Sequence, residues 1–124
     1  MQVDQKYRTL LGKVGFMASR WCRYDDARAI FTGLNQTDPS KAGPYVGLAT
    51  ILMSEGKAAE AISLLKDKAM AAVPEDADVK AYLGLAYFMN KQHAEAKEVL
   101  TPVAASGDAG SAASLAKSLL AQIG

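Results

Sequence analysis

The chain has 124 residues, half of them hydrophobic, which suffices for the core of one domain and is short for two. Fourteen basic and thirteen acidic residues give a formal net charge of +1, which argues against a nucleic-acid partner or an anionic membrane surface. The single cysteine, Cys22, excludes a disulfide within the chain and is typical of a reducing compartment. The N-terminal residues MQVDQKYRTL are polar and no apolar run is long enough to span a bilayer, so we expect a cytoplasmic protein without membrane insertion.

Residues 14–31, VGFMASRWCRYDDARAIF, predict two helices joined by a turn around Cys22. Three arginines in and beside this turn lie close to Asp25 and Asp26, which favours local ion pairs on a solvated face over a phosphate site. Trp21 has two open roles. It packs against the N-terminal turn, which base rates favour, or it anchors an interface.

Residues 48–65, LATILMSEGKAAEAISLL, repeat the first stretch at a step of 34 residues. The matched pairs are Gly15 with Ala49, Ala27 with Ala61, and Phe31 with Leu65. The Gly-Lys pair at 56–57 lacks the spacing of a phosphate-binding loop and follows no predicted strand. The segment therefore predicts a second pair of helices.

Residues 83–100, LGLAYFMNKQHAEAKEVL, continue the pattern at a step of 35 residues. Pro39 and Pro74 are also 35 apart, so the extra residue lies between Leu65 and Pro74. Gly84 lies inside a predicted helix, where glycine costs about 1 kcal/mol relative to alanine. Because Gly84 shares its column with Gly15 and Ala49, we expect the first helix of each pair to approach its neighbours closely at this column.

The last predicted element is an amphipathic helix over about 111–122, after the turn-forming linker 105–110. Its apolar stripe consists of Ala112, Leu115, Ala116, Leu119 and Ile123. Such a helix can cover the last apolar face of a repeat array. Pro102, just before the linker, is predicted to end or kink the preceding helix.

The repeat resembles the tetratricopeptide repeat (TPR), a helix–turn–helix unit of this length with an apolar–small pair in its first helix. These pairs are Val14–Gly15, Leu48–Ala49 and Leu83–Gly84. The resemblance implies an all-α fold: an α-solenoid of three TPR repeats (about 8–41, 42–76 and 77–110) plus a C-terminal capping helix. These units form a single domain over 1–124.

Catalytic and metal-binding chemistry has little support in the sequence. His93 is the only histidine, so neither a zinc site nor a Cys–His nucleophile pair with Cys22 is indicated, and an exposed turn histidine is the favoured interpretation. We therefore expect no enzyme activity, no catalytic residues, no metal and no cofactor.

In the TPR family the first helices line a concave face, so the resemblance implies a partner-binding groove. Its predicted residues are Phe16, Val46, Thr50, Met53, Tyr82, Leu85, Phe88 and Met89. They are mainly apolar, and methionine adapts well to apolar peptides, so a protein or peptide client is expected. Individually, Phe16, Leu85 and Phe88 are equally compatible with a core position. Leu85, Phe88 and Met89 together form a second apolar side of one helix, which indicates a partner or a self-interface.

Two subfamilies bear on the client. The co-chaperones that grip the C-terminal carboxylate of heat-shock proteins use lysines and asparagines at five positions that here read Gly12, Phe16, Gly47, Asp78 and Tyr82, so that function is disfavoured. The layout is similar to the small TPR chaperones of bacterial type III secretion, which implies a cytoplasmic chaperone that holds an apolar segment of a secreted or export-apparatus client. The alternative is a structural or adaptor protein that uses the same surface for self-association or assembly, and homodimerisation stays open.

Overall fold

The structure is a computed structural model that describes residues 23–106 and 110–123. These residues form helices and turns, with no strand among them, so the predicted all-α fold is confirmed. The helices are α2 (Tyr24–Thr37), α3 (Ala42–Ser54), α4 (Ala58–Ser63), η1 (Leu64–Ala69), α5 (Met70–Ala72), α6 (Ala77–Met89), α7 (His93–Ala104) and α8 (Ser111–Ile123). None of them is long and apolar enough to cross a membrane. The predictions for Phe16, Trp21 and Cys22 lie outside the described residues.

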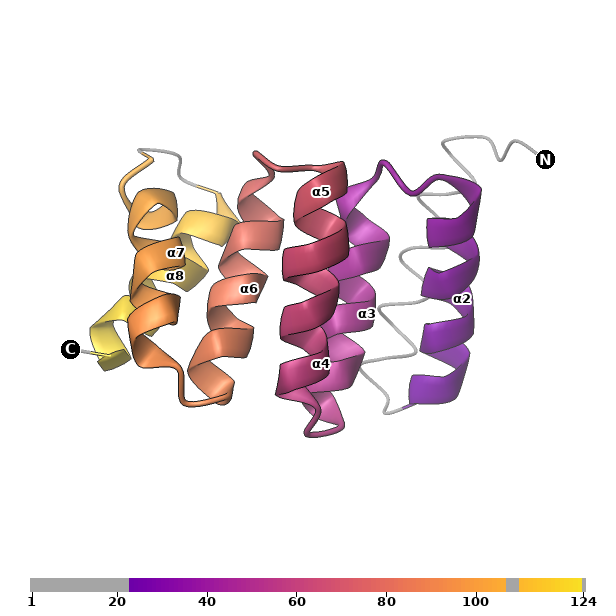
Figure 1. Ribbon diagram of the computed structural model, residues 1–124, viewed down its shortest axis with the longest axis horizontal. Helices are drawn as coiled ribbons and strands as arrows, with labels where there is room; N and C mark the ends of the chain where they lie inside the picture. The colour runs from indigo at the N-terminus through magenta and orange to yellow at the C-terminus, as the bar shows by residue number, and fades with distance from the viewer. Residues whose placement is uncertain (1–22, 107–109, 124) are drawn as a thin grey trace.

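The helices stack in chain order into a solenoid (Figure 1). α4, η1 and α5 form one continuous rod, which packs against α3, and α7 packs against α6 in the same way. α3 also contacts α2 before it and α6 after it, and α8 lies against both α6 and α7. α3 and α6, the first helices within the described residues, are therefore each enclosed by the second helices of their own and the preceding pair and by the helix that begins the next layer.

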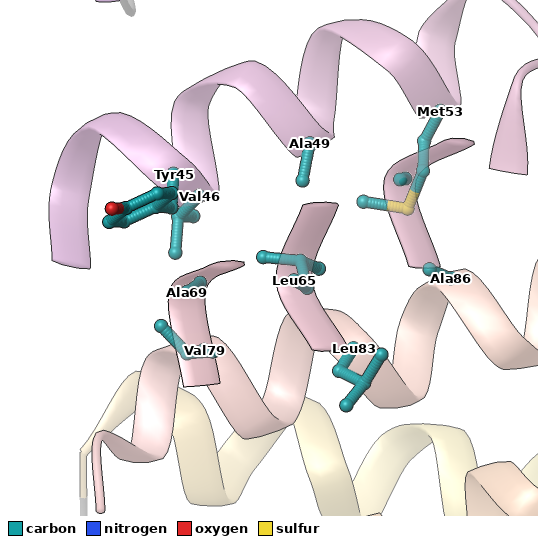
Figure 2. Packing of buried hydrophobic residues seen from close by; sticks show 10 residues of the cluster. Tyr45, Val46, Ala49, Met53, Leu65, Ala69, Val79, Leu83 and Ala86 are labelled. Atoms are coloured by element: carbon teal, nitrogen blue, oxygen red, sulfur yellow. The ribbon is translucent and has the colours of Figure 1, made fainter. Parts of the chain in front are cut away.

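The column of large residues at the centre of the second helices is buried. Phe31, Leu65 and Leu100 occupy equivalent positions in α2, η1 and α7, and their side chains are almost fully enclosed. The alanine column, Ala27, Ala61 and Ala96, is also buried. Figure 2 shows Leu65 packed between α3 and α6. The residues that define the repeat in the sequence are thus the residues that hold the layers together.

The close approach predicted at Gly84 is confirmed. A Cβ atom on Gly84 would clash with the Leu100 side chain, including Cδ1 at 3.0 Å. Gly47 on α3 has a similar role one pair earlier, because a Cβ there would lie 2.6 Å from the Phe31 ring. Both glycines allow a bulky second-helix side chain to lie against a first-helix backbone.

The extra residue of the second repeat is accommodated in a π-helix, η1. In α2 the buried pair Phe31 and Leu34 is separated by three positions, and in α7 so is the pair Leu100 and Val103. In η1 the corresponding buried residues, Leu65 and Ala69, are separated by four. A π-bulge takes in one additional residue while the helix on either side keeps its packing face. This places the insertion between Leu65 and Ala69, within the range predicted from the sequence.

The turns between paired helices share one geometry. After α3, Gly56 N–H donates to Met53 and Lys57 N–H donates to Leu52, and Lys91 N–H and Gln92 N–H make the equivalent bonds after α6. These are the two hydrogen bonds of the Schellman motif, which requires a left-handed residue. Gly56 has φ of 78° and Lys91 has φ of 62°. Lysine therefore occupies a conformation that favours glycine.

Arginine pairing near the start of α2 agrees with the sequence interpretation. Arg23 pairs with Asp26 at 2.6 Å and Arg28 with Asp25 at 3.0 Å. Arg28 also pairs with Glu55, 27 residues away at the end of α3, and this hydrogen bond lowers the pKa of Glu55 below its ordinary value of 4.5. The cluster therefore joins two helices as well as stabilising one.

Pro102 does not end α7. The helix continues through Pro102 and ends at Ala104, within the same final turn. Proline removes the N–H that would bond to the carbonyl four residues earlier, and its ring crowds that carbonyl. Because Pro102 lies in the last turn, this disturbance falls at the end of the helix, with Val103 and Ala104 after it.

Candidate binding surface

Two of the predicted groove residues belong to the core. Val46 and Met53 are only 6% and 5% exposed, and they pack between α3 and α6 in the cluster that contains Leu65, Val79 and Ala86 (Figure 2). Their prediction as lining of an open groove is corrected, because they face the next first helix and not solvent.

Phe88 is the equivalent of Met53 in the next repeat, and it is partly covered by α8. It packs against the cluster that includes Ala116 and Leu119, and its ring meets His93 edge-on at 5.3 Å between centroids. Part of the second apolar side of α6 is therefore covered by the C-terminal helix. The interpretation that this whole side requires a partner is corrected for Phe88.

Four predicted residues keep some exposed surface, although Tyr82 and Leu85 also pack on the core clusters. We call them the first-helix stripe: Thr50, Tyr82, Leu85 and Met89. Tyr82, Leu85 and Met89 lie on one face of α6, at positions i, i+3 and i+7. Met89 is 47% exposed, more than any other large hydrophobic side chain in the described part of the chain. Thr50 on α3 is the equivalent of Leu85, 35 residues earlier, and its hydroxyl donates to the Val46 carbonyl at 2.8 Å. The stripe is therefore apolar on α6, and on α3 its hydroxyl is already hydrogen-bonded within the helix.

On α3, the surface beside the stripe is formed by residues with small side chains. The positions on α3 that correspond to Asp78, Tyr82, Leu85 and Met89 carry small residues, namely Gly43, Gly47, Thr50 and Ser54. A Cβ atom at Gly43 would meet no atom within 4 Å, so the space above it is open. The larger side chains of α6 thus stand next to open space at Gly43, whereas Gly47 is buried against the Phe31 ring.

The charge of this surface is weakly acidic. Asp78 lies on the stripe's face of α6, one turn before Tyr82. Partial burial, with a contribution from the Asp76 carboxylate, raises the pKa of Asp78 above its ordinary value of 3.8. The Asp76 carboxylate itself accepts a hydrogen bond from Val79 N–H at 3.0 Å and caps α6. A carboxylate that is already partly desolvated beside a second one disfavours an acidic ligand at this end.

A pocket lies on the other side of α6, and the sequence analysis did not identify it. It has a volume of about 550 Å³ and is formed by side chains of η1, α5, α6 and α7. Its charged residues occupy positions that no motif distinguishes from an ordinary solvated face, and its tyrosine, Tyr87, fits the core stripe of the helix together with Leu83. Among the described residues, no group of three or more histidine, cysteine, aspartate or glutamate side chains is arranged to hold a metal ion.

Comparison with known proteins agrees with the repeat. The model of the family described as tetratricopeptide repeat matches residues 52–123, more than half of the chain, and the chain belongs to this family. No curated protein matches it by sequence.

Solved structures share its fold at low sequence identity. PcrH from Pseudomonas aeruginosa is similar with a TM-score of 0.80 and 17% identity, over 98% of this chain and 94% of that chain. The first TPR domain of Spaghetti (RPAP3), bound to the HSP90 peptide SRMEEVD, has a TM-score of 0.78 and 22% identity, over 99% of this chain and 94% of that chain. The Sgt2 TPR domain from Aspergillus fumigatus has a TM-score of 0.77 and 20% identity, over 98% of this chain and 82% of that chain. The α-solenoid of TPR repeats is thus the fold of this protein.

Proposed function

We propose that this protein is a non-enzymatic binding module that holds an apolar segment of a partner protein on the first-helix stripe. The observation that carries the proposal is Met89, a large hydrophobic side chain nearly half exposed on the same face as Tyr82 and Leu85. Stacked helix pairs present an extended surface of this kind to their partners. Tyrosine and methionine supply contact area that adapts to an apolar side chain.

The charge of the surface favours a neutral or basic client. The RPAP3 domain is bound to SRMEEVD, a peptide with an acidic end. In this chain the positions expected to grip such a carboxylate include Gly47, Asp78 and Tyr82, which offer no cationic side chain. An acidic peptide would meet the Asp78 carboxylate without a compensating donor, so its binding is disfavoured.

The finer proposal is a cytoplasmic chaperone of a bacterial type III secretion system. Its support is the layout of three repeats followed by a helix, and the resemblance of the first two repeats to that group of chaperones. In this role the stripe would hold an apolar segment of a secreted or export-apparatus protein. Mass spectrometry of proteins that co-purify from the native host tests this assignment, and a client set without secretion substrates would contradict it.

The binding surface itself is tested with one substitution and a matched control. Met89→Glu places a charge at the most exposed residue of the stripe without removing a buried side chain, and Ala94→Glu introduces the same residue at an exposed position of α7. We expect Met89→Glu to weaken client capture by at least about tenfold and Ala94→Glu to leave it unchanged, with equal helical content for both. Client capture that survives Met89→Glu would show that the surface is wrong.

Self-association is the alternative use of the same surface. Sedimentation of the isolated protein distinguishes it from client binding: a dimer that dissociates in Met89→Glu would identify a self-interface, whereas a monomer that captures client supports the proposal.

A further inference from the structure

The pocket on the far side of α6 has an apolar floor and walls from two second helices. We call it the second-helix groove. Its apolar lining consists of Met70, Leu83, Tyr87, Val99 and Pro102. Leu83 is buried beneath the surface, whereas Tyr87 and Val99 are only partly buried and pack on the core clusters from outside. A volume of about 550 Å³ is large enough to take several side chains of a peptide.

The second-helix groove and the first-helix stripe lie on opposite sides of α6. Leu83 and Tyr87 line the groove, and Leu85 and Met89 belong to the stripe. Each pair is offset from the other by two residues, which on an α-helix of 100° per residue is a rotation of about 200°. A partner in the groove therefore leaves the stripe free, and the two surfaces can be occupied together.

The walls of the groove carry opposite charges, with two glutamates on the α7 side and two lysines on the η1 and α6 side. Glu95 and Glu98 lie three residues apart on one face of α7, and no ion pair to either carboxylate is found within residues 23–106 and 110–123. Lys66 lies on η1 across the groove, and Lys80 is already paired with Glu75 at 3.5 Å. The α7 wall is thus acidic and available to a cationic partner.

The π-helix gives an independent reason to examine this groove. The residue inserted between Leu65 and Ala69 has no counterpart in α2 or α7, and Lys66 of the groove lies within that inserted turn. π-bulges occur frequently at functional sites. The π-helical departure from the regular α-helical geometry of the described repeats therefore contributes Lys66 to a wall of the second-helix groove.

We propose that the second-helix groove binds a segment of a partner protein that combines apolar side chains with lysine or arginine residues, independently of the first-helix stripe. The apolar side chains cover Leu83 and Tyr87. The basic residues make charge-assisted hydrogen bonds with Glu95 and Glu98, which are exposed on the α7 wall. This second site would allow the protein to hold two different segments at once.

The proposal is tested by an NMR titration of the full chain with two synthetic helical peptides. One peptide has leucine at its apolar positions and arginine at all charged positions, and the other has glutamate in place of arginine. We expect the arginine peptide to shift the amides of Tyr87 and Glu98 and not that of Met89, and the glutamate peptide to cause no shift.

Charge reversal supplies the matched control. The double variant Glu95→Lys/Glu98→Lys is expected to bind the arginine peptide at least about tenfold more weakly and to gain binding of the glutamate peptide. The variant Glu60→Lys/Asp67→Lys makes the same change in net charge at exposed positions outside the groove, and is expected to bind as the natural chain does.

Three results would overturn the proposal. Equal weakening in both double variants would show non-specific attraction between charged molecules. Loss of arginine-peptide binding in Met89→Glu would place the peptide on the first-helix stripe. A concentration-dependent dimer that dissociates in Glu95→Lys/Glu98→Lys would identify a second copy of this chain as the occupant.

Discussion

At the scale of single residues, the glycines of this protein differ in what their missing side chain allows. Gly84 faces the Leu100 side chain so closely that a Cβ atom would clash, whereas around Gly33 on α2 a Cβ would meet no atom within 4 Å. Both lie inside helices, where alanine is intrinsically favoured by about 1 kcal/mol. Their surroundings therefore give alanine opposite effects at the two positions.

We predict that Gly84→Ala lowers the free energy of unfolding by about 1–3 kcal/mol, because overpacking forces Leu100 or the helices to shift. Gly33→Ala should raise it by about 0.5–1 kcal/mol, since the helix gains propensity and the unfolded chain loses freedom. Urea denaturation of the two variants measures both signs. Stabilisation by Gly84→Ala would contradict the close helix contact.

Lys91 has a backbone conformation that lowers the stability of the folded protein. It has φ of 62° at the position where the preceding repeat has Gly56, and a left-handed conformation costs a non-glycine residue about 1–2 kcal/mol. We predict that Lys91→Gly raises the thermal midpoint, with a gain of about 1 kcal/mol at most, and that Gly56→Ala lowers it. If Lys91→Gly were destabilising, the turn after α6 would not have the geometry of the turn after α3.

Residue-scale burial explains why the binding surface was only partly predictable. Val46 and Thr50 lie one turn apart on the same helix, and both fit the expected pattern of a groove. Val46 is turned towards α6 and is buried, whereas Thr50 stays partly exposed. The difference depends on the angle at which the next first helix packs, which the spacing of apolar residues does not contain.

At the scale of elements, the sequence predicted where the inserted residue lies, but it did not predict that the insertion takes the form of a π-helix. The steps between Phe31, Leu65 and Leu100, and between Pro39 and Pro74, confine the insertion to the end of one repeat. A longer turn would have satisfied the same arithmetic. The π-helix arises because Leu65 and Ala69 must both face the core, so the additional residue has to be absorbed between them.

We therefore predict that deletion of Asp67 converts η1 to an α-helix and changes the free energy of unfolding by no more than about 0.5 kcal/mol. Leu65 and Ala69 would then be three positions apart, as Phe31 and Leu34 are, and would still share one face. Asp67 is exposed, so no buried contact is lost.

Deletion of Gly33 is the matched control for this change. Gly33 is also exposed, but it lies between Phe31 and Leu34, which already have the α-helical spacing. Its removal rotates Leu34 out of the core and should cost about 2–5 kcal/mol, similar to the loss of a buried leucine. Equal destabilisation by the two deletions, measured by thermal denaturation and circular dichroism, would mean that η1 is not a one-residue insertion.

At the scale of the whole molecule, the solenoid is stabilised by contacts between neighbours, so its last helix has a particular role. α8 covers the cluster formed by Ala81, Leu100 and Val103. Leu119 is the largest buried side chain that α8 contributes to this cluster. In a repeat array each element contacts only its neighbours, and stability is close to a sum of such interfaces. A defect in α8 should therefore spread from the C-terminal end and fade along the stack.

We predict that Leu119→Ala costs about 2–4 kcal/mol, because it removes a buried leucine from the core that α8 shares with α6 and α7. Amide hydrogen exchange should show the loss of protection first in α8 and α7, with α3 and α4 retaining more of theirs, since local opening follows cooperative units. Lys117→Ala, an exposed position on the same helix, is the control and should leave both stability and exchange unchanged. Uniform loss of protection over all helices in Leu119→Ala would show instead that the array unfolds as one unit. The interfaces would then be strongly coupled, and a client bound to α6 would stabilise every repeat equally.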